Sequence, residues 1–348
     1  MNTALVKAFD KHDYLKVLLS FDEQLLSAEK NISSYYAELA RQKKSIKNIH
    51  NIVICGMGGS AIAGDFVKSI FSERLPIPII VNRDYTLPAF VNEHTLLIFS
   101  SYSGNTEETL AAFNDALKRG SIMISITADG EIAKLSKSQL LTLISIPGGF
   151  QPRQAIGFSL VTLFRLMEYL FLDEPDHAVT NNHVAWIKEK RSLWSASENN
   201  PLWSLAEKLR KQPVIVYSSE RMFPAALRFK GQVCENAKLL AFANAVPEMN
   251  HNEIVGWDGI DSDAPFSVIL FRDASDHGQI QKRFDILKTI LSKKADVHEI
   301  YAEGNDPFAK FISMIYWGDW VSYFIALLRQ MDPTPVDIIT HFKNELSK

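Results

Sequence analysis

The sequence predicts an α/β protein with two parallel sheets in tandem, each of about five strands and flanked by helices on both faces. In the first half of the chain, short apolar runs alternate with amphipathic stretches of helical period. The same alternation restarts after a polar segment at about 173–201. Strands joined by helical crossovers run parallel, and helices then cover both faces of their sheet.

The first half opens with two predicted helical segments at about 10 to 46. The predicted strands of the first sheet are 51–55, 77–82, 95–100, 121–127 and 140–146. Helical patterns at 60–71 and 106–120 separate some of these strands. A long helix follows at 152–171, where Pro152 suits a first-turn position.

The second half repeats this architecture without a close sequence repeat. Its predicted strands are 213–219, 266–273 and 296–304, and its predicted helices lie at about 223–240, 277–294 and 306–331. The expected domains are 1–172 (N-terminal helices and first sheet), 173–201 (helical linker), 202–331 (second sheet) and 332–348 (C-terminal segment and helix).

The composition excludes several classes of partner. The 348 residues are 47% hydrophobic and 22% charged, as in an ordinary soluble globular protein. A net charge of -3 and a pI near 6.3 leave no electrostatic footprint for nucleic acid or an anionic membrane. The apolar segment 311–328 contains Gly318 and Asp319, and a charge in mid-bilayer is costly, so we expect a buried helix there.

The two cysteines, Cys55 and Cys234, lie far apart and indicate neither a disulfide framework nor a cysteine-based zinc site. The N-terminus lacks the basic start and apolar run of a secretory signal. A cytoplasmic location is therefore expected.

The segment "GMGGSAIAGD" at 56–65 is a glycine-rich turn between a predicted strand and a predicted helix. Such a turn exposes N–H groups at the positive end of the helix dipole, which suits any phosphate. A dinucleotide site also needs an acidic residue at the end of the second strand. That strand ends in Asn82 and Arg83, although Asp84 is close enough to leave the dinucleotide interpretation open.

A second loop, "FSSYSGNTEET" at 99–109, follows the neighbouring strand and is rich in hydroxyl groups. Two such loops on adjacent strand ends predict one phosphate held from both sides, and no lysine of the nucleotide-hydrolysing kind is present. The alternative is that Ser101 and Thr106 merely cap the following helix. The predicted phosphate-binding residues are Gly58, Gly59, Ser60, Ser101, Ser103 and Thr106.

These two loops in order resemble the phosphosugar-binding SIS (sugar isomerase) domain. Four further segments resemble the bifunctional phosphoglucose/phosphomannose isomerases: "PRQAIG" at 152–157, "ENAK" at 235–238, "PEMNHNEIVGW" at 247–257 and "DPTPVDIITHFK" at 332–343. The resemblance covers nearly the whole chain. It implies two tandem SIS domains, each a flavodoxin-like three-layer sandwich, and a cofactor-free enzyme of carbohydrate metabolism, in glycolysis and gluconeogenesis. Its reaction would interconvert glucose 6-phosphate, mannose 6-phosphate or both with fructose 6-phosphate.

Aldose-ketose interconversion needs a base at C1 and C2, an acid or base that opens the ring, and a group that stabilises the enediolate. The resemblance implies that Glu235 is the proton-transfer base. From the residues alone, the preferred interpretation of Glu235 is a surface glutamate that pairs with Lys238. The resemblance also implies that His251 opens the ring from the neighbouring subunit of a homodimer.

Two basic residues complete the candidate catalytic set. Arg153 suits the enediolate or the phosphate because a guanidinium is a fixed fork of donors, and its alternative is a salt bridge at a helix start. Lys343 matches the family's C-terminal lysine near the sugar ring, and its alternative is a solvated helix-end lysine. We expect no metal: His251-x-Glu253 has no downstream Pro-Cys-x-x-Cys, and His-Glu-x-x-His is absent.

Two other functions stay open at this level. One is a non-catalytic, regulatory phosphosugar-binding protein, although no basic helix-turn-helix module is evident. The other is an isomerase of a different phosphosugar, such as an amino or pentose sugar. The segment "YSSERMFPAALRFKG" at 217–231 has no clear counterpart of the hydroxyl-bearing loop. We therefore expect the first domain to bind the phosphate and the second to supply Glu235.

Overall fold

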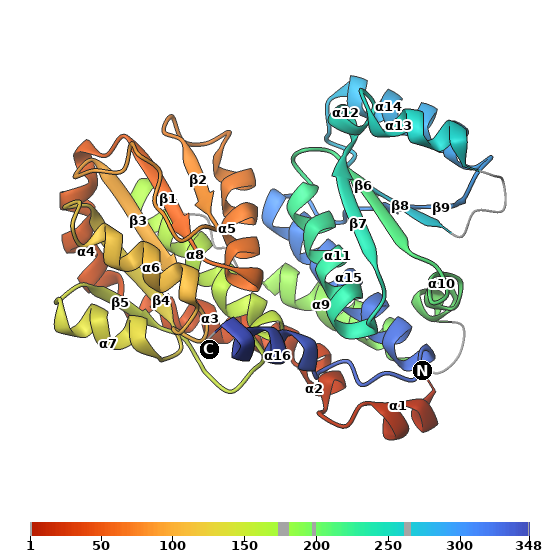
Figure 1. Cartoon of the computed structure of the whole chain (residues 1–348), viewed down its shortest axis with the longest axis horizontal. Coiled ribbons are helices and arrows are strands. Elements are labelled where there is room, and N and C mark those ends of the chain that lie inside the picture. Colours follow the sequence, from red (N-terminus) through yellow and green to blue (C-terminus); the bar gives the residue numbers. More distant parts are fainter. Residues whose placement is uncertain (1, 173–180, 197–199, 261–265, 347) are drawn as a thin grey trace. The chain divides into compact units, whose positions relative to one another are not determined.

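The computed structural model describes residues 2–172, 181–196, 200–260, 266–346 and 348. The chain divides into two compact units (Figure 1). The first unit is Ser20–Ala185, and the second unit combines Met1–Leu19 with Trp186–Lys348. Each unit is built on one parallel sheet with helices packed against it.

The sheet of the first unit has the strand order β2-β1-β3-β4-β5 within the described residues, and every pairing is parallel. Its strands are β1 (Asn51–Cys55), β2 (Ile79–Asn82), β3 (Thr95–Ser100), β4 (Ile122–Thr127) and β5 (Thr142–Ser145). All five predicted strands are confirmed. The central strand β3 is buried along its whole length, which explains its unbroken apolar sequence.

Helices cover both faces of this sheet (Figure 1). They are α3 (Phe21–Ser33), α4 (Tyr36–Ser45), α5 (Gly58–Phe71), α6 (Glu107–Ala116), α7 (Glu131–Ser138) and α8 (Ile156–Phe171). Helices α3, α4 and α5 pack on α8, whereas α6 packs with α7. The long helix predicted at 152–171 starts as a 3-10 turn, η2 (Pro152–Ala155), before it becomes α8.

The sheet of the second unit has the order β7-β6-β8-β9, also entirely parallel. Its strands are β6 (Val214–Ser218), β7 (Ala241–Ala245), β8 (Ser267–Arg272) and β9 (Asp296–Tyr301). Four strands among the described residues replace the expected number of about five. The edge strand β7 was not predicted, because its sequence "AFANA" is rich in alanine and asparagine, which have low strand propensity.

The second unit is mostly helical outside its sheet. Its helices are α1 (Thr3–Phe9), α2 (Tyr14–Leu19), α10 (Pro201–Leu209), α11 (Phe223–Ala237), α12 (Val246–Met249), α13 (Glu253–Gly256), α14 (Gly278–Leu291), α15 (Pro307–Leu328) and α16 (Asp337–Leu346). Helix α9 (Asn181–Trp194) spans the boundary between the units. The range of about 10 to 46, where the sequence predicted two helical segments, contains the three α-helices α2, α3 and α4, and α1 precedes it.

Helix α15 is the buried helix that the sequence predicted at 311–328. In the described part of the chain, it alone is long and apolar enough to cross a membrane, and 94% of its apolar window is buried. Asp319 on α15 accepts hydrogen bonds from Arg228 and Gln232 of α11 at 2.8 Å and 2.7 Å. A buried carboxylate is tolerable when it is paired in this way.

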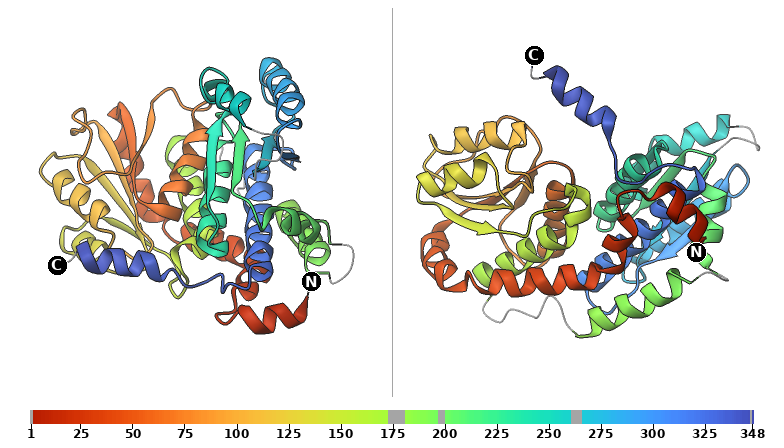
Figure 2. Two further views of the ribbon diagram at one scale, coloured as in Figure 1. Left: turned by 45° about the vertical axis from the view of Figure 1, so that its right-hand side comes forward. Right: turned by 90° about the horizontal axis from the view of Figure 1, so that it is seen from below.

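Helix α16 stands apart from the helices that cover the second sheet (Figure 2). All of its described residues are exposed. Ile338, Phe342 and Leu346 repeat every four residues, so they share one face of the helix, and they are 81%, 64% and 57% exposed. This unit therefore presents an apolar helical stripe to solvent.

Candidate functional site

The carboxyl ends of β1 and β3 lie side by side at the point where the strand order of the first sheet reverses. Strand β1 leads into α5 and β3 leads into α6, and these helices pack with different partners, α8 and α7. Ligands of open α/β sheets bind in the crevice at such a switch point. Both predicted phosphate loops therefore lie at the same switch point, which we call the crevice of the first unit.

A hydrogen bond joins the two loops. The backbone N–H of Tyr102 donates to Ser60 Oγ over 3.3 Å, and Ser60 is only 6% exposed. Because the Ser60 oxygen accepts this bond, its hydrogen is left to donate to an anion. Ser101 Oγ donates to Thr106 Oγ1 at 3.1 Å, which leaves the hydrogen of Thr106 available in turn. Ser103 is exposed, and its Oγ accepts from the N–H of Asn105 at 3.3 Å.

Glycines let the backbone segments around the crevice approach closely. A Cβ at Gly56 would lie 2.5 Å from the carbonyl oxygen of Ser100, so the ends of β1 and β3 meet only without a side chain there. The N–H groups of Gly58 and Gly59 have no acceptor among the described residues and lie at the start of α5. Together with the dipole of this 14-residue helix, they favour an anion.

Arg153 belongs to this cluster as well. A Cβ at Gly59 would lie 3.2 Å from the Pro152 carbonyl oxygen and 3.6 Å from Arg153 Cα, so η2 lies directly on the glycine-rich loop. Arg153 is 5% exposed. The structure thus brings all seven predicted residues of the first unit to one region: Gly58, Gly59, Ser60, Ser101, Ser103, Thr106 and Arg153.

Tyr102 is a contributor that the sequence analysis missed. Its backbone bonds Ser60, and its hydroxyl donates to the carbonyl oxygen of Pro147 at 3.1 Å and accepts from the N–H of Phe150 at 3.0 Å. It therefore connects both loops to the segment that precedes η2. The only sequence signal was its place between two serines of the loop.

The end of β2 is occupied by an ion pair. Arg83 bonds the carboxylate of Asp65 on α5, and Asp84 accepts a hydrogen bond from the N–H of Tyr85 at 2.6 Å. Burial raises the pKa of Asp65 from its usual 3.8, and the bond from Arg83 only partly offsets that effect. The carboxylate of Asp84, which left a dinucleotide interpretation open, thus accepts a hydrogen bond from the backbone of its own loop.

Glu235 lies in the last turn of α11 and is half-buried. The buried face of α11 is fixed by polar contacts: Gln232 and Asn236 each donate to the hydroxyl of Tyr14 over 3.0 Å, and Asn236 also donates to Ser322. Lys238, the alternative partner for Glu235, adopts a left-handed conformation, and its ammonium donates to the Asp332 carbonyl oxygen at 2.6 Å. The helix that bears Glu235 is therefore held firmly within the second unit.

His251 occupies the exposed turn between α12 and α13. Residues that follow it in the sequence anchor the segment to the second sheet. Glu253 accepts hydrogen bonds from Tyr217 and Asn244, and the indole of Trp257 donates to the Tyr217 hydroxyl at 2.9 Å. The histidine is thus presented to solvent on a fixed support.

Lys343 lies on the exposed helix α16. Glu235, His251 and Lys343 therefore occupy three separate elements of the second unit: α11, the turn between α12 and α13, and α16. The seven residues of the first unit form a cluster, whereas these three are not joined by any described contact within their unit.

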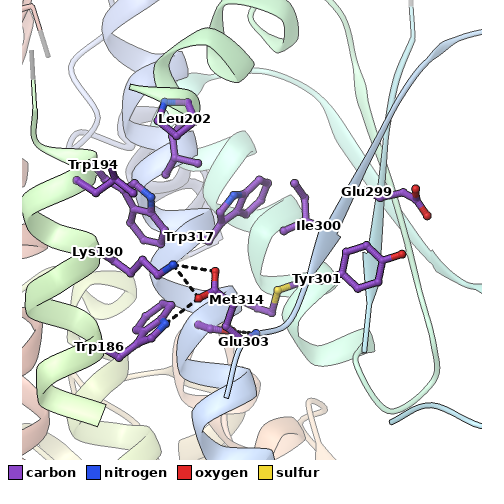
Figure 3. Close-up of a pocket in the computed structure, with 13 residues that line it drawn as sticks. Trp186, Lys190, Trp194, Leu202, Glu299, Ile300, Tyr301, Glu303, Met314 and Trp317 are labelled. Carbon is purple, nitrogen blue, oxygen red and sulfur yellow. Dashed lines mark hydrogen bonds and ion pairs between the residues drawn. The ribbon is translucent and has the colours of Figure 1, made fainter. Parts of the chain in front are cut away.

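A cavity of about 360 Å³ in the second unit contains none of the predicted site residues (Figure 3). Indole rings of Trp186, Trp194 and Trp317 line it. Glu303 accepts hydrogen bonds there from Trp186 at 2.9 Å and from Lys190. Trp186, Lys190 and Glu303 therefore satisfy one another at its wall.

The fold and the paired loops define a protein of two SIS domains. Residues 45–163 match the SIS domain family, and residues 198–346 match the family described as the bacterial phospho-glucose isomerase C-terminal SIS domain. Among solved structures, tagatose-6-phosphate ketose/aldose isomerase from Escherichia coli has the same fold, with a TM-score of 0.74 at 15% identity. The match covers 93% of this chain and 95% of that one.

Two curated relatives show to which family of SIS-domain proteins the chain is similar. A bifunctional phosphoglucose/phosphomannose isomerase of Caldicellulosiruptor bescii is 40% identical, over 87% of this chain and 91% of its own length. One from Aquifex aeolicus is 36% identical, over 88% and 93%. The chain belongs to the family of bifunctional phosphoglucose/phosphomannose isomerases, which confirms the predicted resemblance.

Proposed function

We propose that this protein interconverts glucose 6-phosphate and mannose 6-phosphate with fructose 6-phosphate. The observation that carries the proposal is the crevice of the first unit, where two hydroxyl-bearing loops are bonded through Ser60 and Tyr102 in a chain of this family. Its donors are hydroxyl and N–H groups with Arg153 close by, which is the chemistry that a phosphate monoester requires.

The phosphate anchors the substrate at its unreactive end. Ser60, Ser101, Ser103 and Thr106 supply hydroxyl donors, and Gly58 and Gly59 supply N–H donors. Binding energy from this end orients C1 and C2 for reaction, so the anchor accelerates catalysis without taking part in it.

Glu235 moves the proton. In the aldose-to-ketose direction, its carboxylate takes the proton from C2 of the open chain. The electron pair of that C–H bond forms the C1–C2 double bond, and the C1 carbonyl oxygen becomes an enediolate oxygen. Glu235 then delivers the proton to C1, while the proton of the C2 hydroxyl passes to the C1 oxygen and the C2 carbonyl forms. Because C2 is trigonal in the enediolate, the glucose and mannose epimers share this intermediate, and Arg153 stabilises its negative oxygen.

His251 opens the sugar ring, and we assign it to the neighbouring subunit of a homodimer. The support is its exposure on an anchored turn, together with two exposed apolar features of the same unit: Val255, 68% exposed, and the stripe of α16. Apolar patches of this kind are typical of interfaces. Lys343 on α16 acts near the ring in this scheme.

We further propose that the enzyme uses no cofactor or metal and that it works in the cytoplasm, in glycolysis and gluconeogenesis. Two alternatives remain testable. A non-catalytic regulatory protein would bind sugar phosphates without converting them. An isomerase of another phosphosugar would convert an amino or pentose sugar phosphate but not fructose 6-phosphate.

A coupled assay distinguishes these functions. Purified protein is incubated with fructose 6-phosphate in chelator, and glucose 6-phosphate and mannose 6-phosphate are detected by separate coupling enzymes. Glucosamine 6-phosphate and ribose 5-phosphate serve as competing substrates. We expect both aldoses to form in chelator, with Glu235→Gln inactive. Saturable binding of fructose 6-phosphate without either product would support the regulatory alternative.

Subunit complementation tests the shared site. Glu235→Gln and His251→Ala are purified separately, unfolded together in equal amounts and refolded. Random pairing makes half of the dimers mixed, and each mixed dimer has one intact site of two, so about a quarter of the wild-type activity should return. No recovery, in a mixture that sedimentation shows to be dimeric, would place His251 and Glu235 of one site in the same subunit.

A further inference from the structure

The strand order of the second sheet reverses between β6 and β8, as that of the first sheet reverses between β1 and β3, and we call the carboxyl ends of β6 and β8 the second crevice. The strand orders β2-β1-β3-β4 and β7-β6-β8-β9 match position by position, so β6 corresponds to β1 and β8 to β3. Helix α11 follows β6 as α5 follows β1. The residue directly after β3 is Ser101, and the residue directly after β8 is Asp273. A carboxylate thus stands where the first unit has a hydroxyl predicted to bind phosphate.

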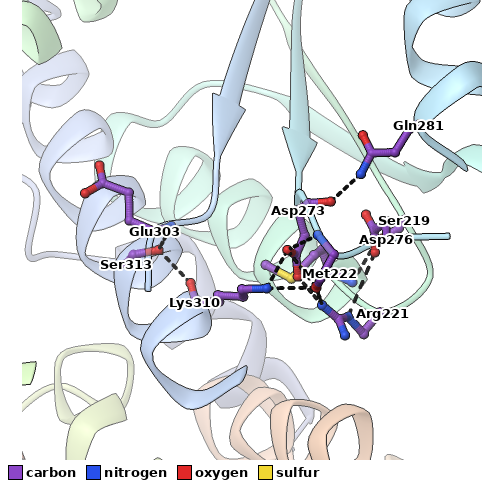
Figure 4. A network of polar contacts seen from close by, with 10 residues as sticks. Ser219, Arg221, Met222, Asp273, Asp276, Gln281, Glu303, Lys310 and Ser313 are labelled. Atoms are coloured by element: carbon purple, nitrogen blue, oxygen red, sulfur yellow. Dashed lines mark hydrogen bonds and ion pairs between the residues drawn. The ribbon is translucent and has the colours of Figure 1, made fainter. Parts of the chain in front are cut away.

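This carboxylate is held as a bound anion would be (Figure 4). Asp273 is completely buried. Its Oδ1 accepts hydrogen bonds from Lys310 at 2.7 Å, from the N–H of Ser275 at 2.9 Å and from the Ser275 hydroxyl at 3.0 Å, and its Oδ2 bonds Arg221. Two cations, an N–H group and a hydroxyl are the set of donors that commonly surrounds a small oxyanion.

The cations come from elements that border the crevice. Arg221 lies on the turn between β6 and α11, and Lys310 lies in the first turn of α15. Both also contact the Ser275 hydroxyl. Burial opposes the ionisation of Asp273, but the bonds from Lys310, Ser275 and Arg221 outweigh it and lower the pKa of the carboxyl group.

A second carboxylate lies beside Arg221. Asp276 accepts a hydrogen bond from Ser219 Oγ at 3.0 Å and lies 3.9 Å from Arg221 Nε. The crevice therefore holds two carboxylates against two cations. An incoming phosphate would therefore meet no net positive charge.

We propose that Asp273 is the built-in anion of the second crevice and that it keeps phosphate out of this crevice. Its carboxylate neutralises Arg221 and Lys310 in place of a phosphate. Removing that carboxylate converts the crevice into a binding site for inorganic phosphate or sulfate. The inference depends on the charges of the second unit alone and does not require the proposed isomerase activity.

The crevice is separate from Glu235. Helix α11 runs from the carboxyl end of β6 back toward the amino end of β7. Glu235 lies twelve residues after Phe223, the start of this helix, which corresponds to about 18 Å at 1.5 Å per residue. An anion taken up beside Arg221 would thus occupy the opposite end of the helix.

The test compares Asp273→Ala, which removes the carboxylate, with Asp273→Asn, which removes the charge but keeps the space filled. Wild type, both variants and Asp285→Ala are heated in sodium phosphate and in sodium chloride of equal ionic strength. Asp285 is a matched control, because it pairs with Arg272 of the same unit but is 67% exposed. Calorimetric titration with inorganic phosphate counts the sites in each protein.

We expect Asp273→Ala alone to gain one phosphate site per chain and to show an increase in Tm in phosphate that exceeds that of wild type by several degrees. If wild type binds phosphate and Asp273→Ala gains no further site, this proposal is wrong while the first crevice keeps its function. If Asp273→Ala gains a site that wild type lacks entirely, this proposal stands and the phosphate site of the first unit fails.

Folding provides a second readout. If Asp273→Ala is insoluble in chloride, its soluble yield after refolding is compared in phosphate and in chloride. Recovery in phosphate that Asp273→Asn does not share would support the internal-anion assignment. Equal failure in both salts would overturn it.

Discussion

Replacing Ser60 by alanine tests the role of the crevice in the first unit. Ser60 is 6% exposed, and its oxygen accepts the N–H of Tyr102 at 3.3 Å while its hydrogen remains available. A hydrogen bond to a charged group contributes about 1.5–3 kcal/mol. Its loss should therefore raise KM for fructose 6-phosphate by about tenfold to a hundredfold, because each 1.4 kcal/mol is a factor of ten. The kcat should change little, since the phosphate lies away from the reacting carbons.

The same substitution also removes the bond between the loops, so Tm must be measured beside KM. An N–H group left without its acceptor costs about 1–3 kcal/mol of stability. Ser72→Ala is the matched control: Ser72 lies at the other end of α5, where its hydroxyl bonds the Lys68 carbonyl oxygen. A lower Tm with an unchanged KM in Ser60→Ala would show that this serine only braces the loops, which would refute the phosphate-binding assignment.

Two further predictions concern buried charges. Asp319→Ala should lower the free energy of unfolding by about 3–5 kcal/mol in urea titrations, because Arg228 loses its buried carboxylate. The double variant Asp319→Leu, Arg228→Met should be more stable than Asp319→Ala, and a less stable double variant would contradict this reasoning. The raised pKa of Asp65 means that its protonated form is favoured in the folded state, so its contribution to stability is lost as pH rises above 3.8. The stability of Asp65→Asn relative to wild type should therefore increase as the pH is raised from below 3.8 to neutral. A stability difference that does not change with pH would refute the assignment.

The local pattern of apolar and polar residues was sufficient to predict most of the fold. The five strands of the first sheet are apolar runs bounded by turns, so their sequence alone identifies them. Strand β7 escaped prediction because an edge strand of alanine and asparagine has no apolar pattern to detect. The bonds from Gln232 and Asn236 to Tyr14 could not be predicted either, because they join residues more than 200 positions apart in the sequence.

In the candidate site, too, features that the local sequence determines were predictable, and features that depend on long-range packing were not. The hydroxyl loops after β1 and β3 were predictable, because parallel strands bring their carboxyl ends to one edge. The contact of Arg153 with Gly59 depends on how α8 packs, which no local pattern specifies. The segment after β6 lacked a recognisable phosphate loop, and the structure supplies a physical reason: Arg221 binds Asp273 there.

Isomerisation in deuterated water tests the central claim most directly. The protein is incubated with fructose 6-phosphate in D₂O, and the products are followed by NMR for wild type and Glu235→Gln. Glu235 can exchange the proton that it has taken from C1 with solvent before it delivers a proton to C2. Proton transfer through Glu235 therefore predicts solvent deuterium at C2 in a fraction of the glucose 6-phosphate and mannose 6-phosphate formed by wild type, and no product from Glu235→Gln. Labelled aldose that forms at an unchanged rate in Glu235→Gln would contradict the account.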